Sequence, residues 1–246
     1  MTSTSAFQVF VTSLLFWALP RPPILKSVTG TPVLERPQTA AEELANSISH
    51  GAGFVLAAAA APVLITHAAR RGGFGNVAGA AVFAGSLVAL YLTSMLYHGL
   101  PPGGAKRALR AVEHVAIFLL IAGTYTPFTL GVFRGGCGWA LFALIWALAA
   151  AGTTLKLLAG PERFPIVSTA LYLVMGWLFV AFWPLWPQMP HAPGGLYLIA
   201  GGLAYTLGVP FYAASQLRYH HLIWHLFVMT GSAFHFFAVL LCAAPR

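Results

Sequence analysis

The sequence predicts an all-α, multi-pass membrane protein with seven transmembrane helices and a cytoplasmic N-terminus. Of the 246 residues, 59% are hydrophobic and only 7% are charged, and the mean hydropathy is +0.79. A soluble domain carries roughly 25% charged residues, so this chain could not cover a surface in water. Its apolar stretches are long and do not alternate as the strands of a transmembrane barrel would. Helices remain, because in lipid they satisfy their own backbone hydrogen bonds.

A membrane span needs ~20 apolar residues, and the sequence contains seven such stretches. In chain order we expect spans over residues 44–68, 74–98, 111–133, 137–158, 166–186, 194–214 and 220–243. Residues that favour loops separate them, at 70–73 (RRGG), 101–104 (PPGG), 135–136 (GG), 160–163 (GPER), 187–195 (PQMPHAPGG) and 216–218 (QLR). Because these loops are short, residues 41–246 should form one bundle.

Local features refine two of the spans. Pro127 lies inside the third span, where we expect it to kink the helix. Gly75 and Gly79 open the second span at a spacing that lets helix backbones approach closely.

Residues 1–40 are interpreted as an N-terminal extension that is interfacial or disordered. The apolar run at 7–19 is too short to span a bilayer and has no basic segment before it, unlike a signal peptide. An eighth span is the weaker alternative.

The basic residues predict the orientation. With the N-terminus inside, nine of the 13 Lys and Arg fall on the cytoplasmic side, as the positive-inside rule requires. This orientation is opposite to that of G-protein-coupled receptors, and the last span has no Lys to bind retinal. The net charge of +8 is scattered over the loops without an aromatic-interleaved stripe, so nucleic acid is not expected as a partner.

The chain has nine histidines, and most of them fall at the level of the cytoplasmic leaflet. Those at this level are His50, His98, His114, His220, His221 and His225. Glu113, the acidic residue inside a predicted span, lies at the same depth. Polar residues within lipid are costly and often functional, so this layer is the main candidate site.

The spacing of these residues favours zinc. His221 and His225 are four residues apart and share one helix face, and H-x-x-x-H on a helix commonly presents two zinc ligands. With His98 they would give three nitrogen ligands and an open fourth position for water, which is the pattern of a catalytic zinc. Zinc lowers the pKa of such a water to ~7, and Glu113 could orient the water or take its proton. Ser94 lies one turn before His98.

Other interpretations stay open. His50, His114 and His235 could each be a hydrogen-bonded packing residue. Haem is the main competing ligand, but it needs neither the paired histidines nor the acid. Cys137 and Cys242 fall on the same predicted side of the membrane, so a disulfide between them is also open.

Four segments resemble motifs of a known family. They are 42–51 (EELANSISHG), 94–98 (SMLYH), 121–128 (IAGTYTPF) and 221–225 (HLIWH). Together they are similar to the bacterial hemolysin III proteins, which belong to the progestin and adipoQ receptor (PAQR) family with the adiponectin receptors. The resemblance covers about residues 40–243.

This resemblance implies a multi-pass protein of the bacterial inner membrane with zinc near its cytoplasmic face. The implied ligands are His98, His221 and His225, and Ser94 matches a serine one turn before the first ligand. Glu113 occupies a position that is Asp in relatives, and in those proteins the Asp holds the zinc-bound water. The resemblance also implies a chemistry like that of alkaline ceramidases, the hydrolysis of a lipid amide.

Two hypotheses follow. In the first, the protein is a zinc-dependent hydrolase of a lipid amide or ester, with a ceramide-like or other acyl-chain substrate from the membrane. Glu113 is then the base, and Ser94 bonds to the water or to the developing oxyanion. In the second, the protein is a non-enzymatic cytolysin or a regulator of membrane lipid homeostasis with structural zinc. A pore is poorly supported, because the polar residues gather at one level.

Overall fold

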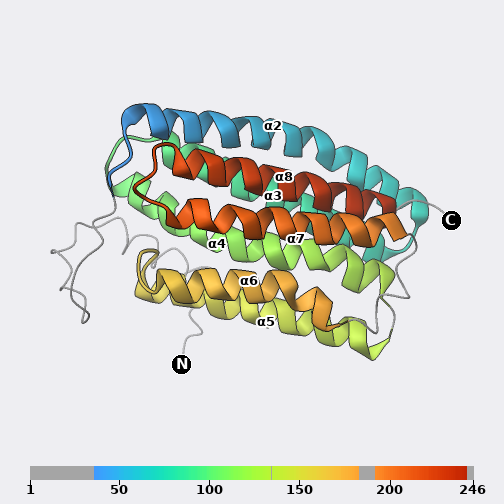
Figure 1. Cartoon of the computed structure of the whole chain (residues 1–246). Helices are drawn as coiled ribbons and strands as arrows, with labels where there is room; N and C mark the ends of the chain where they lie inside the picture. The colour runs from blue at the N-terminus through green and yellow to red at the C-terminus, as the bar shows by residue number, and fades with distance from the viewer. Residues whose placement is uncertain (1–35, 134, 183–191, 243–246) are drawn as a thin grey trace, which may run out of the picture.

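The computed structural model describes residues 36–133, 135–182 and 192–242. Within these residues the chain forms seven α-helices and one π-helix that pack lengthwise into a bundle (Figure 1). In chain order they are α2 (Ala40–Arg71), α3 (Phe74–Gly99), α4 (Gly104–Pro127), the π-helix η1 (Phe128–Val132), α5 (Gly136–Ala159), α6 (Pro165–Ala181), α7 (Ala192–Ala213) and α8 (His220–Cys242).

The seven α-helices coincide with the seven predicted spans, so the predicted fold class is confirmed. Six of them are long and apolar enough to cross a membrane, and α6, with 17 residues, is shorter. The fifth span was expected to reach residue 186, but residues 183–191 lie outside the described part of the chain. The same holds for the apolar run at 7–19 and for most of the expected extension over residues 1–40.

Helix α2 begins before its apolar stretch because Thr39 caps it. The Thr39 side chain accepts a hydrogen bond from the backbone of Glu42, and the Glu42 carboxylate accepts one from the backbone of Thr39. This capping box satisfies two amides that the first turn leaves free. Glu42 also pairs with Arg36 at 2.5 Å and accepts a hydrogen bond from the backbone N–H of Tyr219 at 2.8 Å. The start of α2 is thereby tied to the residues that precede α8.

At Pro127, where the sequence predicts a kink, the structure shows a change of helix type. Helix α4 ends at Pro127 and continues directly into η1. The backbone of α3 approaches closely here, since a Cβ atom at Gly79 would overlap Pro127 Cα. The predicted close approach of helix backbones at Gly75 and Gly79 is therefore present. Gly79 lies against Pro127, and Gly75 lies against the backbone of Leu130.

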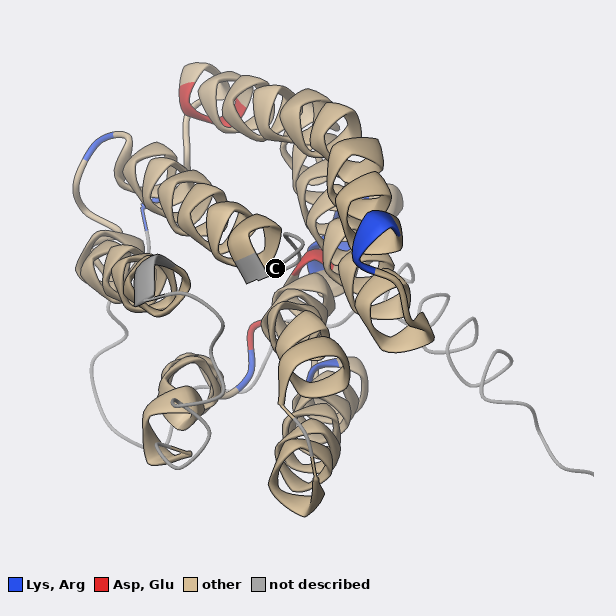
Figure 2. Ribbon diagram, turned by 90° about the vertical axis from the view of Figure 1, so that its right-hand side faces the viewer, with Lys and Arg blue, Asp and Glu red and all other residues tan. Residues whose placement is uncertain are grey.

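The outside of the bundle is apolar, as expected of a surface in contact with lipid. Large side chains such as Leu44, Ile48 and Val55 are exposed along α2, and charged residues interrupt the helices at few positions (Figure 2). Phe83 and Phe118 fill the interior and are fully buried. The chain is a multi-pass membrane protein.

Candidate metal centre

The candidate residues come from three helices that meet at one end of the bundle. His98 lies in the last turn of α3, and Glu113 lies near the start of α4. His221 and His225 occupy the first turns of α8. Successive helices run in opposite directions, so the end of α3 and the starts of α4 and α8 are neighbours (Figure 1).

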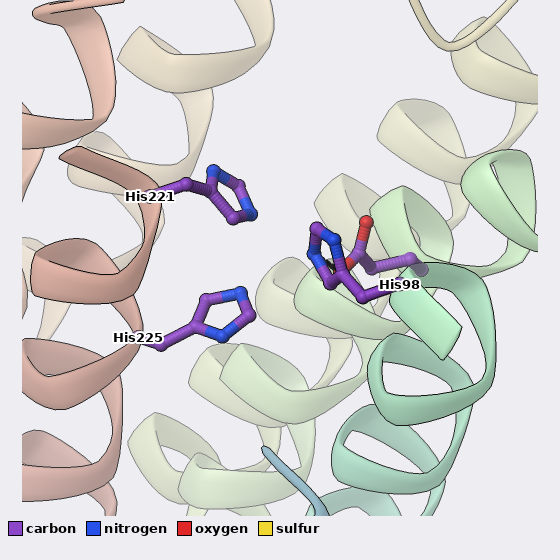
Figure 3. A group of neighbouring side chains, drawn as sticks. His98, His221 and His225 are labelled. Atoms are coloured by element: carbon purple, nitrogen blue, oxygen red, sulfur yellow. Dashed lines mark ion pairs between the residues drawn. The ribbon is translucent and has the colours of Figure 1, made fainter. Parts of the chain in front are cut away.

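The structure brings His98, Glu113, His221 and His225 together. Each can offer one ligand atom so that all four atoms lie within 4.8 Å of one another. The ring centroids of the histidines are 4.6 Å apart for His221 and His225, 4.9 Å for His98 and His221, and 5.1 Å for His98 and His225. The three rings converge from two sides of a small space (Figure 3).

The tautomer of His98 follows from its partner on α2. Its Nδ1 lies 2.7 Å from Oε2 of Glu43. An ionised carboxylate only accepts hydrogen bonds, so Nδ1 carries the proton and donates it. In the neutral ring Nε2 then has the lone pair, and Oε1 of Glu113 lies 3.7 Å from this nitrogen.

His225 is held in a similar way. Its Nδ1 lies 3.0 Å from Oγ of Ser49, and the same hydroxyl donates to the backbone carbonyl of Asn46 at 2.8 Å. The hydroxyl proton is already used, so Ser49 accepts from Nδ1–H and the lone pair of His225 is on Nε2. The ring also stacks on His50, with a centroid separation of 3.5 Å and an interplanar angle of 7°.

These residues fit a zinc ion. Within the described part of the chain, Nε2 of His98 and Oγ of Ser94 are buried without a hydrogen-bond partner, and each such group costs about 1–3 kcal/mol if nothing satisfies it. Imidazole nitrogens and a carboxylate are ligands that zinc prefers. Ser94 is fully buried one turn from His98, and no hydrogen bond joins its hydroxyl to any of the four cluster residues.

A cavity of about 130 Å³ adjoins the cluster. Glu113, His221 and His225 contribute to one part of its wall. Most of the rest is formed by apolar and aromatic side chains of α4, α6, α7 and α8, together with His50 of α2 and Leu90 of α3. His235 also lines it, ten residues beyond His225 and ~15 Å further along the helix by rise per residue. The cavity therefore extends along α8 from the candidate ligands to His235.

The remaining histidines have other surroundings. His114 donates from Nδ1 to the carbonyl of Arg110 at 2.8 Å, and Nε2 of His235 lies 3.3 Å from the carbonyl of Leu198. Both are hydrogen-bonded, as one interpretation of the sequence expected. For His50 that interpretation is wrong within the described residues, because neither ring nitrogen has a partner and both are buried. Its position opposite His225 favours ring stacking instead.

Sequence reasoning missed the roles of Glu43 and Ser49. Both lie in the first motif, yet neither was a candidate, because neither adds a ligand atom to the cluster. Their hydrogen bonds join α2 to α3 and α8, and no local sequence pattern indicates such contacts between helices. The spacing of Glu43, Asn46 and His50 does mark one polar face on α2. That polar face predicts that α2 contacts the interior of the bundle, but it does not predict which histidine each residue contacts.

The sequence comparisons agree with this architecture. The family model described as "Haemolysin-III related" matches residues 38–236. The chain belongs to this family. The match includes all four residues of the cluster and the two residues of α2, Glu43 and Ser49, that form hydrogen bonds with its histidines.

Curated relatives cover most of the chain. Hemolysin-3 of Bacillus cereus is 42% identical over 205 residues, which is 83% of this chain and 93% of the relative. The hemolysin-3 homolog of Bacillus subtilis is 42% identical over 203 residues, covering 82% and 94%. The human monocyte to macrophage differentiation factor is 32% identical over 173 residues, covering 64% and 67%, and supports the wider PAQR superfamily. No solved structure matches the chain.

Proposed function

We propose that this haemolysin-III-related protein is a zinc-dependent hydrolase of lipid amide or ester bonds. The observation that carries the proposal is that three of the four cluster residues, Glu113, His221 and His225, lie in the wall of a long, mostly apolar cavity. Such a cavity suits a substrate with an acyl chain, and a polar cluster at one end suits a cleavable bond beside that chain. A ceramide-like lipid in the membrane leaflet at the level of the cluster has both an acyl chain and a cleavable amide bond beside it.

The residues divide the chemistry between them. Zinc held by His98, His221 and His225 would supply a water whose pKa falls to about 7. Glu113 is placed to orient that water and accept its proton. We assign to the hydroxyl of Ser94, which is buried without a partner among the described residues, a hydrogen bond to the oxygen that becomes negative in the transition state.

The overall reaction consumes one water. The water oxygen bonds to the acyl carbon, the C–N or C–O bond breaks, and the proton accepted by Glu113 passes to the departing amine or alcohol. The products are a fatty acid and the remaining part of the lipid. The apolar cavity wall would hold the acyl chain and keep other water away from the reacting carbon.

A second function deserves a test because of one feature of the cluster. Glu113 is close enough to act as a fourth ligand, and four protein ligands are typical of a structural zinc site. In that case zinc would stabilise a non-enzymatic cytolysin or a regulator of membrane lipid homeostasis. The name of the Bacillus cereus relative, Hemolysin-3, favours the cytolysin.

One experiment separates the two functions. The purified protein is incubated in detergent micelles with ceramide and with acyl esters, and released fatty acid is measured. The hydrolase should release fatty acid from at least one lipid class, and a zinc chelator should stop the release until zinc is added back. A zinc-loaded protein that releases no fatty acid from either class, yet causes leakage of lipid vesicles, would support the cytolysin and refute the hydrolase.

A further inference from the structure

Helix α2 contributes no ligand atom to the cluster, yet it contacts two of the three histidines. Glu43 binds Nδ1 of His98, and Ser49 binds Nδ1 of His225. Both contacts use the ring nitrogen that faces away from the cluster. Each one therefore leaves Nε2 as the lone-pair atom and limits the rotation of the ring about its side-chain bonds.

Glu43 is itself held by a cation. Its second oxygen, Oε1, lies 3.2 Å from Nζ of Lys106. Lys106 also donates to the carbonyl of His98 at 3.4 Å and to that of Leu100 at 3.1 Å, which are among the carbonyls left free where α3 ends. A chain of contacts thus runs from Lys106 through Glu43 to the His98 ring.

The charges on this chain of contacts differ from those around His225. Glu43 is a carboxylate that is 24% exposed, whereas Ser49 is neutral. A carboxylate that accepts from the far nitrogen of a metal-bound histidine fixes its tautomer and makes it a stronger ligand, and loss of such a partner commonly lowers metal affinity 10–100-fold. A hydroxyl fixes the tautomer without adding charge.

We infer that α2 is the element that positions the metal site, with Glu43 as the positioning residue for His98 and Ser49 as the positioning residue for His225. The inference rests on the zinc site of the proposed function, but not on any reaction there. Of these two residues, Glu43 is expected to have a larger effect on metal affinity than Ser49. Lys106 pairs with the second oxygen of the Glu43 carboxylate and so holds the first one directed at the ring.

The test measures zinc affinity of the full-length protein in detergent by competition with a chromophoric chelator. Glu43→Ala should weaken zinc binding 10–100-fold. Glu43→Gln keeps an acceptor for Nδ1–H but loses the charge, so its affinity should lie between those of Glu43→Ala and the wild type. Ser49→Ala should weaken binding less than Glu43→Ala does.

A matched control lies on the same helix. Ser47 donates its hydroxyl to the carbonyl of Met95 at 2.9 Å, so it links α2 to α3 without touching a histidine. Ser47→Ala should bind zinc as the wild type does. Melting temperatures of the metal-free proteins, and the visible absorption of the cobalt-substituted proteins, separate a change at the site from a general loss of stability.

Several results would overturn the inference. The first is a zinc affinity of Glu43→Ala within twofold of the wild type. The second is a loss of zinc affinity in Ser47→Ala equal to that in Glu43→Ala. The third is a visible absorption of the cobalt-substituted protein that is unchanged in all Glu43 variants. If Glu43→Ala does not fold, the nearly isosteric Glu43→Gln decides by the same criteria. A wild type that binds zinc but releases no fatty acid would refute the hydrolase alone, and a wild type that binds no zinc would refute both.

Discussion

Glu113 is the residue on which the two proposed functions differ most. It is buried, one of only five acidic residues in the chain, and its carboxylate lies among three imidazoles. The sequence resemblance implies an Asp at this position in relatives, and because Glu is one methylene longer, the Glu113 carboxylate reaches ~1 Å further from the backbone. As a base it would move a proton, and as a ligand it would only hold the metal.

Substitution of Glu113 distinguishes these roles. Glu113→Gln removes the proton acceptor but keeps the size of the side chain, so we expect zinc to remain bound and fatty-acid release to fall by about 10²–10⁴. The measurements are metal content and rate on the same preparation. Glu162→Gln is the control, because Glu162 pairs with Arg110 and is 56% exposed. Loss of zinc from Glu113→Gln, or hydrolysis at the wild-type rate, would contradict the role as base.

At the scale of elements, the site depends on how closely α3 and α4 pack. His98 is carried by α3 and Glu113 by α4, and the two helices come into backbone contact at their other ends through Gly79 and Pro127. Small residues allow such approaches in membranes, where packing rather than the hydrophobic effect holds helices together. The two helices therefore approach each other at both ends, through Gly79 and Pro127 at one end and through His98 and Glu113 at the other.

A glycine pair on α3 tests this contact. Gly79→Ala should destabilise the protein by about 1–3 kcal/mol, because the added methyl group overlaps Pro127 and forces the helices apart. Gly85→Ala places the same methyl group where no atom lies within 4 Å, so it should leave the melting temperature in detergent unchanged or slightly higher. Equal melting temperatures for the two variants would contradict the proposed role of the contact.

The sequence predicted the helices better than it predicted their ends. Apolar stretches of about 20 residues located every helix, since the cost of placing polar residues in lipid dominates their positions. Hydropathy does not register the capping box at Thr39 and Glu42, so α2 starts four residues earlier than its apolar stretch. Hydropathy also does not register the π-helix that follows Pro127.

The candidate site was predictable in part. The i, i+4 pair His221 and His225 is a local pattern, and the alternating direction of the spans placed His98 and Glu113 at the same depth. The partners of the histidines on α2 required the three-dimensional packing. A hydrogen bond such as that between Ser49 and His225 spans 176 residues of sequence, and no periodicity encodes it.

At the scale of the whole molecule, the bundle has a polar end and a long apolar body. The histidine cluster, the Glu43–Lys106 pair and the Arg36–Glu42 pair all lie at the end where α2 starts. The distribution of Lys and Arg over the loops predicts that this end faces the cytoplasm. A hydrolase at this end would act on lipids of the inner leaflet.

Cysteine labelling tests the orientation. Cys137 is exposed at the start of α5, on the predicted outer side, so in a Cys242→Ala background it should react with a membrane-impermeant maleimide on spheroplasts. As a matched control, Leu217→Cys in a variant that lacks both native cysteines places a thiol in the exposed α7–α8 loop. It should react only after permeabilisation. The reverse pattern would show that the candidate site lies outside.

The central claim is that His98, His221 and His225 hold a zinc ion, and metal content tests it most directly. Mass spectrometry of the detergent-purified protein should find about one zinc per chain in the wild type and none in His221→Ala/His225→Ala. His220→Ala is the neighbouring control and should keep the metal, because the His220 ring bonds to the carbonyl of Phe211 instead. A folded wild type without zinc, or a double variant that keeps it, would contradict the account.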